Sequence, residues 1–448
     1  MMDGPVAHTK SAKRDKRAAS GTNGWVDTAR GLVERDAFVS DDVFRLEFER
    51  IFDRTWMYLA HESEIPAAGD YVARTLGSAP VVVVRGADGT IHAHLNSCRH
   101  RGTKLCRADM GNAAHFVCPY HGWSYRHDGS LITTTFDRHF PDGTDFSELA
   151  LIKVPRVESY QGLIFGCWDP DVIDLPRHLG DFRTYLDIFF GRTPKGMEVL
   201  APPHRWRVKA NWKVGALNFI GDSQHVVTTH IGPLTLDPIR AASKGLVKVA
   251  DESFQVMTDQ GHGATISYLA SSIPDSAYQS HSPDLERLYE QTLARAQRDV
   301  LRRLRVMVGN VFPNLSFIES QAGPGEKAVI LRLWQPIGAS EMEVLSWVFA
   351  EREASAAYKE NVLKLGYRNF GAAGVFEQDD MELWASGATA SNNPIAKQFP
   401  WGFQTALRYL PKPESSNKIP GRIYRPADTE AAQFEFMQYW DQMMRANA

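Results

Sequence analysis

Cysteine is scarce in this sequence, with four residues among 448. Four thiols cannot form a disulfide framework in a chain of this length, so a reducing compartment fits the composition better. A charge excess of either sign is also lacking, because 50 basic and 53 acidic residues leave a net charge of −3. We therefore do not expect nucleic acid to be the main partner, since it would favour a large basic excess.

Long apolar runs are absent as well. No stretch approaches the roughly 18 uninterrupted apolar residues of a membrane span, and the run PVVVV at 80–84 predicts a buried strand. Residues 1–24 are rich in lysine and arginine, but the apolar stretch that a secretory signal needs does not follow them. We expect this segment to be a disordered basic tail, and the protein to be cytoplasmic with no membrane contact.

The length and the pattern of the remaining sequence indicate several parts. A chain of 448 residues is too long for one ordinary core, which favours two or three domains. Residues 36–55 have the apolar spacing of a helix, with Ser40 as a plausible N-cap. Between 68 and 168, short strand-like runs alternate with the turn signals ADG, MGN and HDG, which predicts a small antiparallel β domain.

Beyond residue 180 the predicted helices and strands are segregated, which indicates an α+β fold and excludes a doubly wound parallel sheet. The predicted strands cover 204–210, 245–257, 263–269, 314–320, 327–336 and 342–350. The predicted helices cover 283–306, 351–366 and 372–386.

Three of the four cysteines lie in one stretch, CRHRGTKLCRADMGNAAHFVCPYHGW at 98–123. Cys98 and His100 form one arm, and Cys118 and His121 form the other, a pattern that suits a soft or borderline metal. Zinc fingers of the two-cysteine, two-histidine type keep both cysteines on one arm. One cysteine and one histidine on each arm suit a two-iron cluster in which one iron takes both thiolates and the other both imidazoles. Cys106 and Cys167 are expected to be bystanders.

A second group of metal-binding side chains lies in NWKVGALNFIGDSQHVVTTH at 211–230. Two histidines and one carboxylate hold oxygen-activating non-haem iron(II) and leave positions open for substrate and O₂. His225 and His230 are five residues apart, about 140° around an ideal helix, and the β-branched residues between them disfavour a regular helix. We therefore expect a distorted helix here. The third ligand must come from elsewhere, and GVFEQDDMELW at 374–384 offers Glu377, Asp379, Asp380 and Glu382, which would otherwise form a solvated acidic face.

Together these motifs resemble the α subunit of the Rieske non-haem iron ring-hydroxylating dioxygenases, over most of the chain. The segment CRHRG…CPYHGW resembles the Rieske motif, so Cys98, His100, Cys118 and His121 would bind one [2Fe–2S] cluster. The spacing of Asn218, Asp222, His225 and His230 resembles the second motif of the family. By this resemblance His225, His230 and Asp380 would hold one mononuclear iron(II). Asn218 and Asp222 would be catalytic, with Asp222 linking His121 of one subunit to His225 of the next.

The resemblance also implies a domain division and a set of partners. Residues 1–24 would be the tail and 25–55 a helical segment packing on the catalytic domain. Residues 56–175 would be an all-β Rieske domain, and 176–448 a catalytic domain with an antiparallel sheet flanked by helices, a helix-grip fold. A ferredoxin and an NADH-dependent reductase would supply electrons, and a small β subunit would complete an α3β3 assembly, or α3 without it.

The implied reaction is the cis-dihydroxylation of an aromatic ring, in a hydrocarbon of one or more rings, by O₂. The alternatives are action on an aromatic carboxylate or another substituted arene, a Rieske monooxygenase or demethylase, and an electron carrier without oxygen chemistry. The continuation after Asp380, MELWASG, differs from the GENW typical of biphenyl- and toluene-type enzymes, so the substrate stays open. The expected apolar pocket residues are Phe219, Val226, Phe312, Phe317, Phe370 and Phe376.

Overall fold

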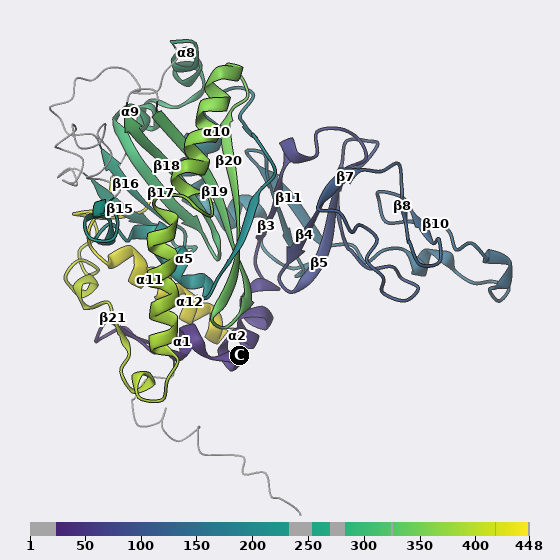
Figure 1. Ribbon diagram of the computed structural model, residues 1–448, viewed down its shortest axis with the longest axis horizontal. Helices are drawn as coiled ribbons and strands as arrows, with labels where there is room; N and C mark the ends of the chain where they lie inside the picture. Colours follow the sequence, from purple (N-terminus) through teal and green to yellow (C-terminus); the bar gives the residue numbers. More distant parts are fainter. Residues whose placement is uncertain (1–23, 233–252, 269–282, 324–325, 417, 447–448) are drawn as a thin grey trace, which may run out of the picture.

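The computed structural model describes residues 24–232, 253–268, 283–323, 326–416 and 418–446. Figure 1 shows a large body of strands and helices, from which a smaller part built of strands, drawn in indigo and blue, projects to one side. The strands pair antiparallel and the helices are segregated from them, so the predicted α+β class is confirmed. Within the described ranges, no helix is long and apolar enough to cross a membrane.

The smaller part contains three sheets. The first has the order β6-β5-β4-β7, the second β10-β9-β8 and the third β11-β12-β3. Their bounds are β3 Met57–His61, β4 Asp70–Leu76, β5 Ala79–Arg85, β6 Ile91–Leu95, β7 Met110–Asn112, β8 Phe116–Val117, β9 Ser124–Tyr125, β10 Leu131–Thr133, β11 Arg156–Tyr160 and β12 Leu163–Cys167.

Strand β5 of the smaller part contributes side chains to two hydrophobic cores. Successive side chains of a strand point to opposite faces, and all four valines of 81–84 are buried. Val81 and Val83 join the core shared with the larger body, whereas Val82 and Val84 pack with Cys98 and Cys118. The cysteine loops therefore rest directly on this strand.

The larger body is built on a nine-stranded antiparallel sheet. Its order is β13-β20-β19-β18-β17-β16-β15-β22, and β14 also pairs with β20. The bounds are β13 Met197–Val199, β14 His204–Val208, β15 Phe254–Met257, β16 Gly263–Tyr268, β17 Leu304–Val311, β18 Leu315–Gly323, β19 Glu326–Gly338, β20 Glu341–Glu351 and β22 Arg422–Tyr424.

Helices cover both faces of this sheet. On the face to which Ile318 and Ile330 point lie α5 (Trp212–Gly221), α10 (Ala356–Phe370), α11 (Glu377–Ser391) and α12 (Ala431–Ala446). Figure 1 shows α10 lying over β19 and β20, the strands that it contacts. On the face to which Phe317 and Leu331 point lie α3 (Leu175–Leu179), α4 (Arg183–Phe190), α8 (Pro283–Thr292) and α9 (Arg295–Arg303).

The N-terminal segment packs against the larger body. It contains β1 (Val26–Asp27), β2 (Leu32–Val33), α1 (Asp36–Val39), α2 (Asp41–Glu47) and the π-helical turn η1 (Phe48–Phe52), and β2 pairs with β21 (Trp401–Gly402). Ser40 caps α2 by accepting from the backbone N–H of Val43, as its position in the sequence predicts.

A buried carboxylate ties this segment to two helices of the larger body. Glu47 at the end of α2 accepts from Trp212 Nε1 at 3.0 Å and from Trp440 Nε1 at 2.8 Å. The same carboxylate is paired with the buried ammonium of Lys213. This contact fixes the first turn of α5 against α2 and α12.

A second buried ion pair joins the smaller part to the sheet. Arg74 of β4 donates to Glu64 at 2.6 Å, and Trp347 of β20 donates to the same Glu64 oxygen at 3.0 Å. Both charged side chains are almost fully buried, so the orientation of the smaller part is set by directed hydrogen bonds as well as by apolar packing.

Three sequence predictions need correction. The predicted helix 351–366 begins at Ala356 and continues to Phe370, because β20 extends to Glu351 and Ser355 is the N-cap of the helix. The predicted helix 283–306 is two helices followed by β17, because the helical pattern RAQRDVLRR runs without a break into the strand LRVMVGNV. The predicted helix 372–386 begins at Glu377 and continues to Ser391, since Gly371 and Gly374 lie in the turn before it. Residues 1–23 of the predicted tail and 245–252 of a predicted strand lie outside the described residues.

Candidate metal centres

Two loops with matching backbone geometry carry the first group of donors. In one loop Gly102 N–H donates to Cys98 C=O at 2.9 Å, and in the other Gly122 N–H donates to Cys118 C=O at 3.0 Å. Both glycines have positive φ, 77° and 75°, which a residue with a Cβ rarely adopts. The motif glycines therefore close each loop so that its cysteine and histidine face the other loop.

The side chains of these loops fit a two-iron cluster. The thiols of Cys98 and Cys118 are buried, while the imidazole rings of His100 and His121 lie with their centroids 4.5 Å apart. The His100 ring stacks on Trp123, and its Nδ1 is buried without a hydrogen-bond partner among the described residues. A buried nitrogen without a hydrogen-bond partner and two buried thiols in the facing loops fit a set of metal ligands.

Hydrogen bonding and burial distinguish the cysteines. The Tyr125 hydroxyl lies 3.3 Å from Cys98 Sγ and itself accepts from the backbone N–H of Arg99. Burial raises the pKa of the Cys98 thiol, although the contact with Tyr125 lowers it in part. Burial also raises the pKa of Cys106 to about 12 and that of Cys167 to about 11, so these two thiols stay protonated and pack as apolar groups.

The second group lies where α5 gives way to irregular backbone. α5 ends at Gly221, Asp222 is its C-cap, and His225–Val227 form a single 3-10 turn, η6. A regular helix would hold the rings of His225 and His230 apart. The irregular backbone between them allows the two rings to approach. The N-cap position of this turn is Gln224, so Asp222 does not cap the segment that follows.

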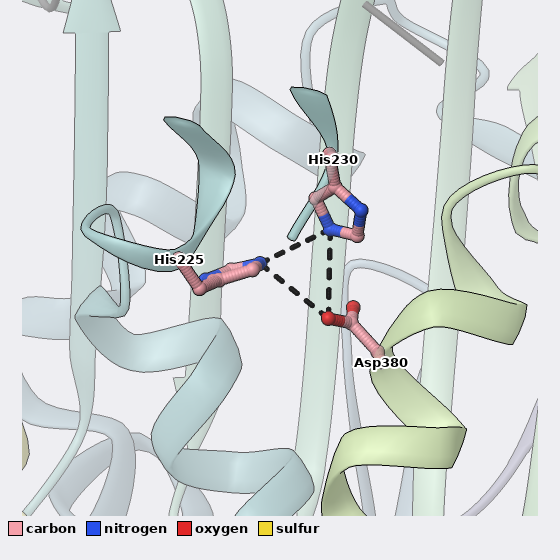
Figure 2. A group of neighbouring side chains, drawn as sticks. All are labelled: His225, His230 and Asp380. Carbon is pink, nitrogen blue, oxygen red and sulfur yellow. Dashed lines mark hydrogen bonds and ion pairs between the residues drawn. The ribbon is translucent and has the colours of Figure 1, made fainter. Parts of the chain in front are cut away.

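His225, His230 and Asp380 converge on one point (Figure 2). The two Nε2 atoms are 3.1 Å apart, and Asp380 Oδ1 lies 3.6 Å from Nε2 of His225 and 3.5 Å from Nε2 of His230. Ligand atoms about 2.1 Å from a metal and at right angles to one another are about 3 Å apart. The described donors therefore fit one face of a single metal ion.

The second nitrogens of both imidazoles also have acidic or carbonyl neighbours. His225 Nδ1 contacts the backbone oxygen of Asp222 and lies 3.5 Å from its carboxylate, and His230 Nδ1 lies 3.5 Å from Asp379. Such contacts fix the orientation of a metal-binding imidazole. Burial alone would lower the pKa of His225, but the carboxylates of Asp222 and Asp380 outweigh it and raise the pKa. The amide nitrogen of Asn218 lies 3.5 Å from His225 Nε2.

The expected pocket residues separate into two groups. Phe376 meets His230 edge to face at 5.1 Å and stacks on Phe370 at 5.6 Å. Phe219, on α5, packs against Trp334 on the same face of the sheet, and Val226 lies in η6 beside His225. Phe376 therefore contacts a donor directly and Phe370 contacts Phe376, whereas Phe219 and Val226 lie on α5 and η6, the elements that lead to and include His225.

Phe317 and Phe312 do not join this neighbourhood. Phe317 packs on Phe189 at 4.7 Å and on Phe182 at 6.1 Å, across the opposite face of the sheet from the donors. Strand alternation causes this, since Ile318 and not Phe317 points toward the helices that carry the donors. Phe312 lies at the end of β17 and packs on Phe436 and Tyr439 of α12.

A buried ion pair beside the donors was not predicted from the sequence. Arg332 of β19 bonds Glu377 at 2.5 Å, and both side chains are 1% exposed. Burial raises the pKa of Glu377 to about 7, against the lowering effect of Arg332, and the charge of Asp380 adds to the increase. The sequence offers Glu377 only as one acid among four, and no local pattern links it to Arg332, 45 positions earlier.

Each group of candidate donors lies within a range of the chain that matches a family model. Residues 55–145 match the Rieske [2Fe–2S] domain, and residues 195–446 match the ring hydroxylating alpha subunit (catalytic domain). The chain is 35% identical to biphenyl dioxygenase subunit alpha of Paraburkholderia xenovorans, over 86% of this chain and 85% of that protein. It is 33% identical to N,N-dimethyl phenylurea N-demethylase subunit alpha of Sphingobium sp., over 93% and 92%.

Solved structures give the same result. Naphthalene 1,2-dioxygenase from Rhodococcus sp., bound to indole, superposes with a TM-score of 0.87 at 36% identity, covering 93% of this chain and 94% of that one. The chain therefore belongs to the ring-hydroxylating dioxygenase α-subunit family. It is an oxidoreductase that incorporates O₂, and like its family it carries a Rieske [2Fe–2S] cluster and a mononuclear non-haem iron.

The contact of Tyr125 with Cys98 predicts an effect on the reduction potential of the cluster. A hydrogen bond to sulfur stabilises the reduced, more negative state, so Tyr125→Phe is expected to lower the potential. One such bond contributes about 0.5–1.5 kcal/mol, which for one electron corresponds to roughly 20–65 mV. Voltammetry of the purified protein measures this shift. Tyr71→Phe is the control, because its ring packs on Phe116 in the same part of the molecule; an equal shift in both variants would contradict the prediction.

Proposed function

We propose that this chain is the α subunit of a terminal oxygenase that cis-dihydroxylates a neutral aromatic hydrocarbon. The observation that carries the proposal is the convergence of two histidines and one carboxylate beside Phe376 and Phe370, in a chain that also holds the cysteine–histidine loops. In the proposed reaction one arene, one O₂, two electrons and two protons give one cis-dihydrodiol. The biphenyl and naphthalene dioxygenases among the similar proteins support this reaction.

The proposal assigns each donor. Cys98 and Cys118 hold one iron of the [2Fe–2S] cluster, and His100 and His121 hold the other. His225, His230 and Asp380 hold the mononuclear iron. Asp380 is favoured over Asp379 because its oxygen lies near Nε2 of both histidines, whereas Asp379 lies at the far nitrogen of His230. Asp379 would then orient that ring by accepting from it.

When bound, the cluster supplies single electrons and the mononuclear iron activates O₂. The chain itself supplies the place for the ring. Phe376 contacts His230, Phe219 and Phe370 belong to the same hydrophobic cluster, and Val226 adjoins His225 in η6, so in this proposal these apolar side chains would bind an arene beside the donors. The charge of Arg332 is paired with Glu377, so this cation does not favour a carboxylate on the substrate. Of the other cations near these motifs in the sequence, Arg368 lies on α10, and Arg240 and Lys244 lie outside the described residues.

Asp222 is proposed to join two subunits. Its side chain is 37% exposed while it lies 3.5 Å from His225, so it is accessible to a group from a neighbouring copy. In the proposal His121 of that copy donates to Asp222, which requires at least a trimer of this chain. The dioxygenase relatives are named as α subunits, which supports a β subunit and an α3β3 assembly. A ferredoxin and an NADH-dependent reductase would supply electrons in the cytoplasm.

One observation favours a second candidate. The phenylurea N-demethylase subunit alpha is similar over 93% of this chain, so the same metals could remove an N-methyl group from an aromatic substrate. In that reaction one oxygen atom goes to the released formaldehyde and the other to water. In cis-dihydroxylation both atoms stay on the ring.

Incubation with ¹⁸O₂ separates the two functions. Naphthalene, biphenyl, benzoate and an N,N-dimethyl phenylurea are supplied to the complete enzyme system, and the products are identified by mass spectrometry. We expect doubly labelled cis-dihydrodiols from the two hydrocarbons and little turnover of benzoate. Formaldehyde from the phenylurea, with no diol from either hydrocarbon, would replace the proposal with the second candidate.

The ligand assignment predicts selective loss of metals. His230→Ala is expected to lose the mononuclear iron and all oxygenation while it keeps the electron paramagnetic resonance signal of the reduced cluster. Asp380→Ala should behave in the same way, whereas Asp379→Ala should retain most of its iron, because it removes only the partner of a ligand. Iron analysis with the resonance spectrum measures both. Normal iron in Asp380→Ala and none in Asp379→Ala would reverse the choice of carboxylate.

The proposed role of Asp222 predicts a defect in turnover without a loss of metal. Asp222→Asn keeps the shape of the side chain but removes its charge, and charge-assisted hydrogen bonds are roughly twice as strong as neutral ones. We expect both metals to remain and the cluster to reduce normally, while steady-state turnover falls steeply. An Asp222→Asn variant that turns over at the wild-type rate would contradict the proposed link between His121 of one subunit and His225 of the next. Size-exclusion chromatography with light scattering checks the trimer independently.

A further inference from the structure

The space between β19 and the start of α11 holds a buried charge with an unusual environment. The Arg332 guanidinium lies 5.3 Å from the ring centroid of Phe219 and 5.9 Å from that of Phe370. Trp206 and Trp334 lie at 5.6 Å and 5.5 Å. Four aromatic rings thus surround one cation, and Phe219 and Phe370 belong to the proposed pocket.

This side chain bonds two helices at the point where they meet. One arm of the guanidinium, Nη2, donates to the C=O of Phe370, the last residue of α10, at 2.8 Å. The other arm, Nη1, bonds the carboxylate of Glu377, the first residue of α11, at 2.5 Å. Arg332 therefore fixes the end of one helix and the beginning of the next relative to the sheet.

The turn between these helices is folded back on itself. Val375 N–H donates to Arg368 C=O at 3.0 Å, and Phe376 N–H donates to Asn369 C=O at 3.2 Å. A Cβ on Gly374 would lie 2.6 Å from Asn369 O, so only glycine fits there. Because the turn is this tight, the position of Phe376 is set by the end of α10 and the start of α11, both of which Arg332 holds.

The metal-binding carboxylate is one turn further along α11. Glu377 and Asp380 are three residues apart, which places them on the same side of a helix. A shift or rotation of the first turn of α11 would move Asp380 away from His225 and His230 and move Phe376 away from His230.

The pair is poorly arranged for stability alone. Arg332 Nε and Glu377 Oε1 are buried and have no hydrogen-bond partner among the described residues. Replacing a buried ion pair with apolar side chains of similar volume is often neutral or stabilising. Its retention at this point is better explained by the geometry that it imposes than by the stability it adds.

We infer that Arg332, through Glu377 and the Phe370 carbonyl, is a positioning residue that sets Asp380 and Phe376 against the two histidines. This inference rests on the proposed function, because it takes Asp380 to be the iron ligand and Phe376 to be part of the pocket. It predicts that the pair governs how firmly the mononuclear iron is held and how efficiently O₂ is used, with little effect on the fold.

The opposite face of the sheet provides a matched control. Arg192 bonds Glu319 at 2.5 Å and Glu351 at 2.8 Å, and these side chains are as deeply buried as Arg332 and Glu377. Lys327 lies 3.7 Å from Glu351, so removal of Arg192 and Glu319 together leaves a paired cation and anion. A change in general stability affects both pairs, whereas a change in ligand position affects only the first.

The test compares Arg332→Met/Glu377→Met with Arg192→Met/Glu319→Met in the complete purified oxygenase. Three quantities are measured: thermal unfolding with the cluster spectrum, the rate at which a ferrous chelator removes the mononuclear iron, and the naphthalene diol formed per O₂ consumed after reduction by dithionite. We expect the first double variant to keep its cluster and its fold. It should release iron faster and form less diol per O₂, each by about tenfold or more, since small misplacements can reduce rates on the order of 10²-fold.

The control is expected to keep the wild-type iron release and diol yield. Wild-type values of both in a folded Arg332→Met/Glu377→Met protein would overturn the inference, and so would an equal loss in the control. If that double variant does not fold, Glu377→Gln decides by the same two measurements: faster iron release supports the inference, and unchanged release overturns it. A wild-type protein that binds the iron but forms no diol would contradict the proposed function instead, and iron release would still test the role of Arg332.

Discussion

The carboxylate of Glu47 holds together the segments on which the metal-binding residues depend. It lies at the end of α2, receives two indole N–H groups from α5 and α12, and neutralises a lysine that is fully buried. An uncompensated ammonium at that depth would be strongly destabilising, so Lys213 must stay beside Glu47, and the hydrogen bond from Trp212 to the same carboxylate adds to this constraint. The direction of α5 follows from this contact, and with it the place where α5 ends and His225 begins.

Both metal groups use the same physical solution to a shared problem. Donor atoms from separate segments must converge, and the cysteines and histidines of both groups lie where the chain leaves α-helices and strands, whereas Asp380 lies on the regular helix α11. Glycines with positive φ close the two cysteine loops, and a 3-10 turn replaces the helix between Asp222 and His230. Rigid elements then fix the ends of these irregular segments: β5 lies under the loops, and α5 and α11 flank the histidines.

The sequence points to candidate donors because metal chemistry restricts residue type and spacing. Cys98, His100, Cys118, His121, His225 and His230 stand in patterns that few other functions require. It predicted the surroundings less well. The sequence alone could not show on which face of the sheet Phe317 lies, because that depends on the register of β18. Strand β17 was not recognised in the sequence because an arginine-rich helix precedes it directly. Arg332 could not be connected with Glu377 because their contact depends on the packing of α11 against β19, which leaves no local pattern.

The position of Phe376 has a consequence for how this enzyme could diversify. The same residue touches His230, stacks on Phe370 and is the N-cap of the helix that carries Asp380. A substitution of Phe376 that reshapes the proposed pocket also changes the start of α11. The same substitution would therefore alter both the range of substrates and the binding of the metal. Phe219 lies in the regular part of α5 and is linked to Asp380 only indirectly, through the Arg332 guanidinium 5.3 Å from its ring. New substrate preferences should therefore accumulate first on α5 and reach the turn before α11 only with compensating changes elsewhere.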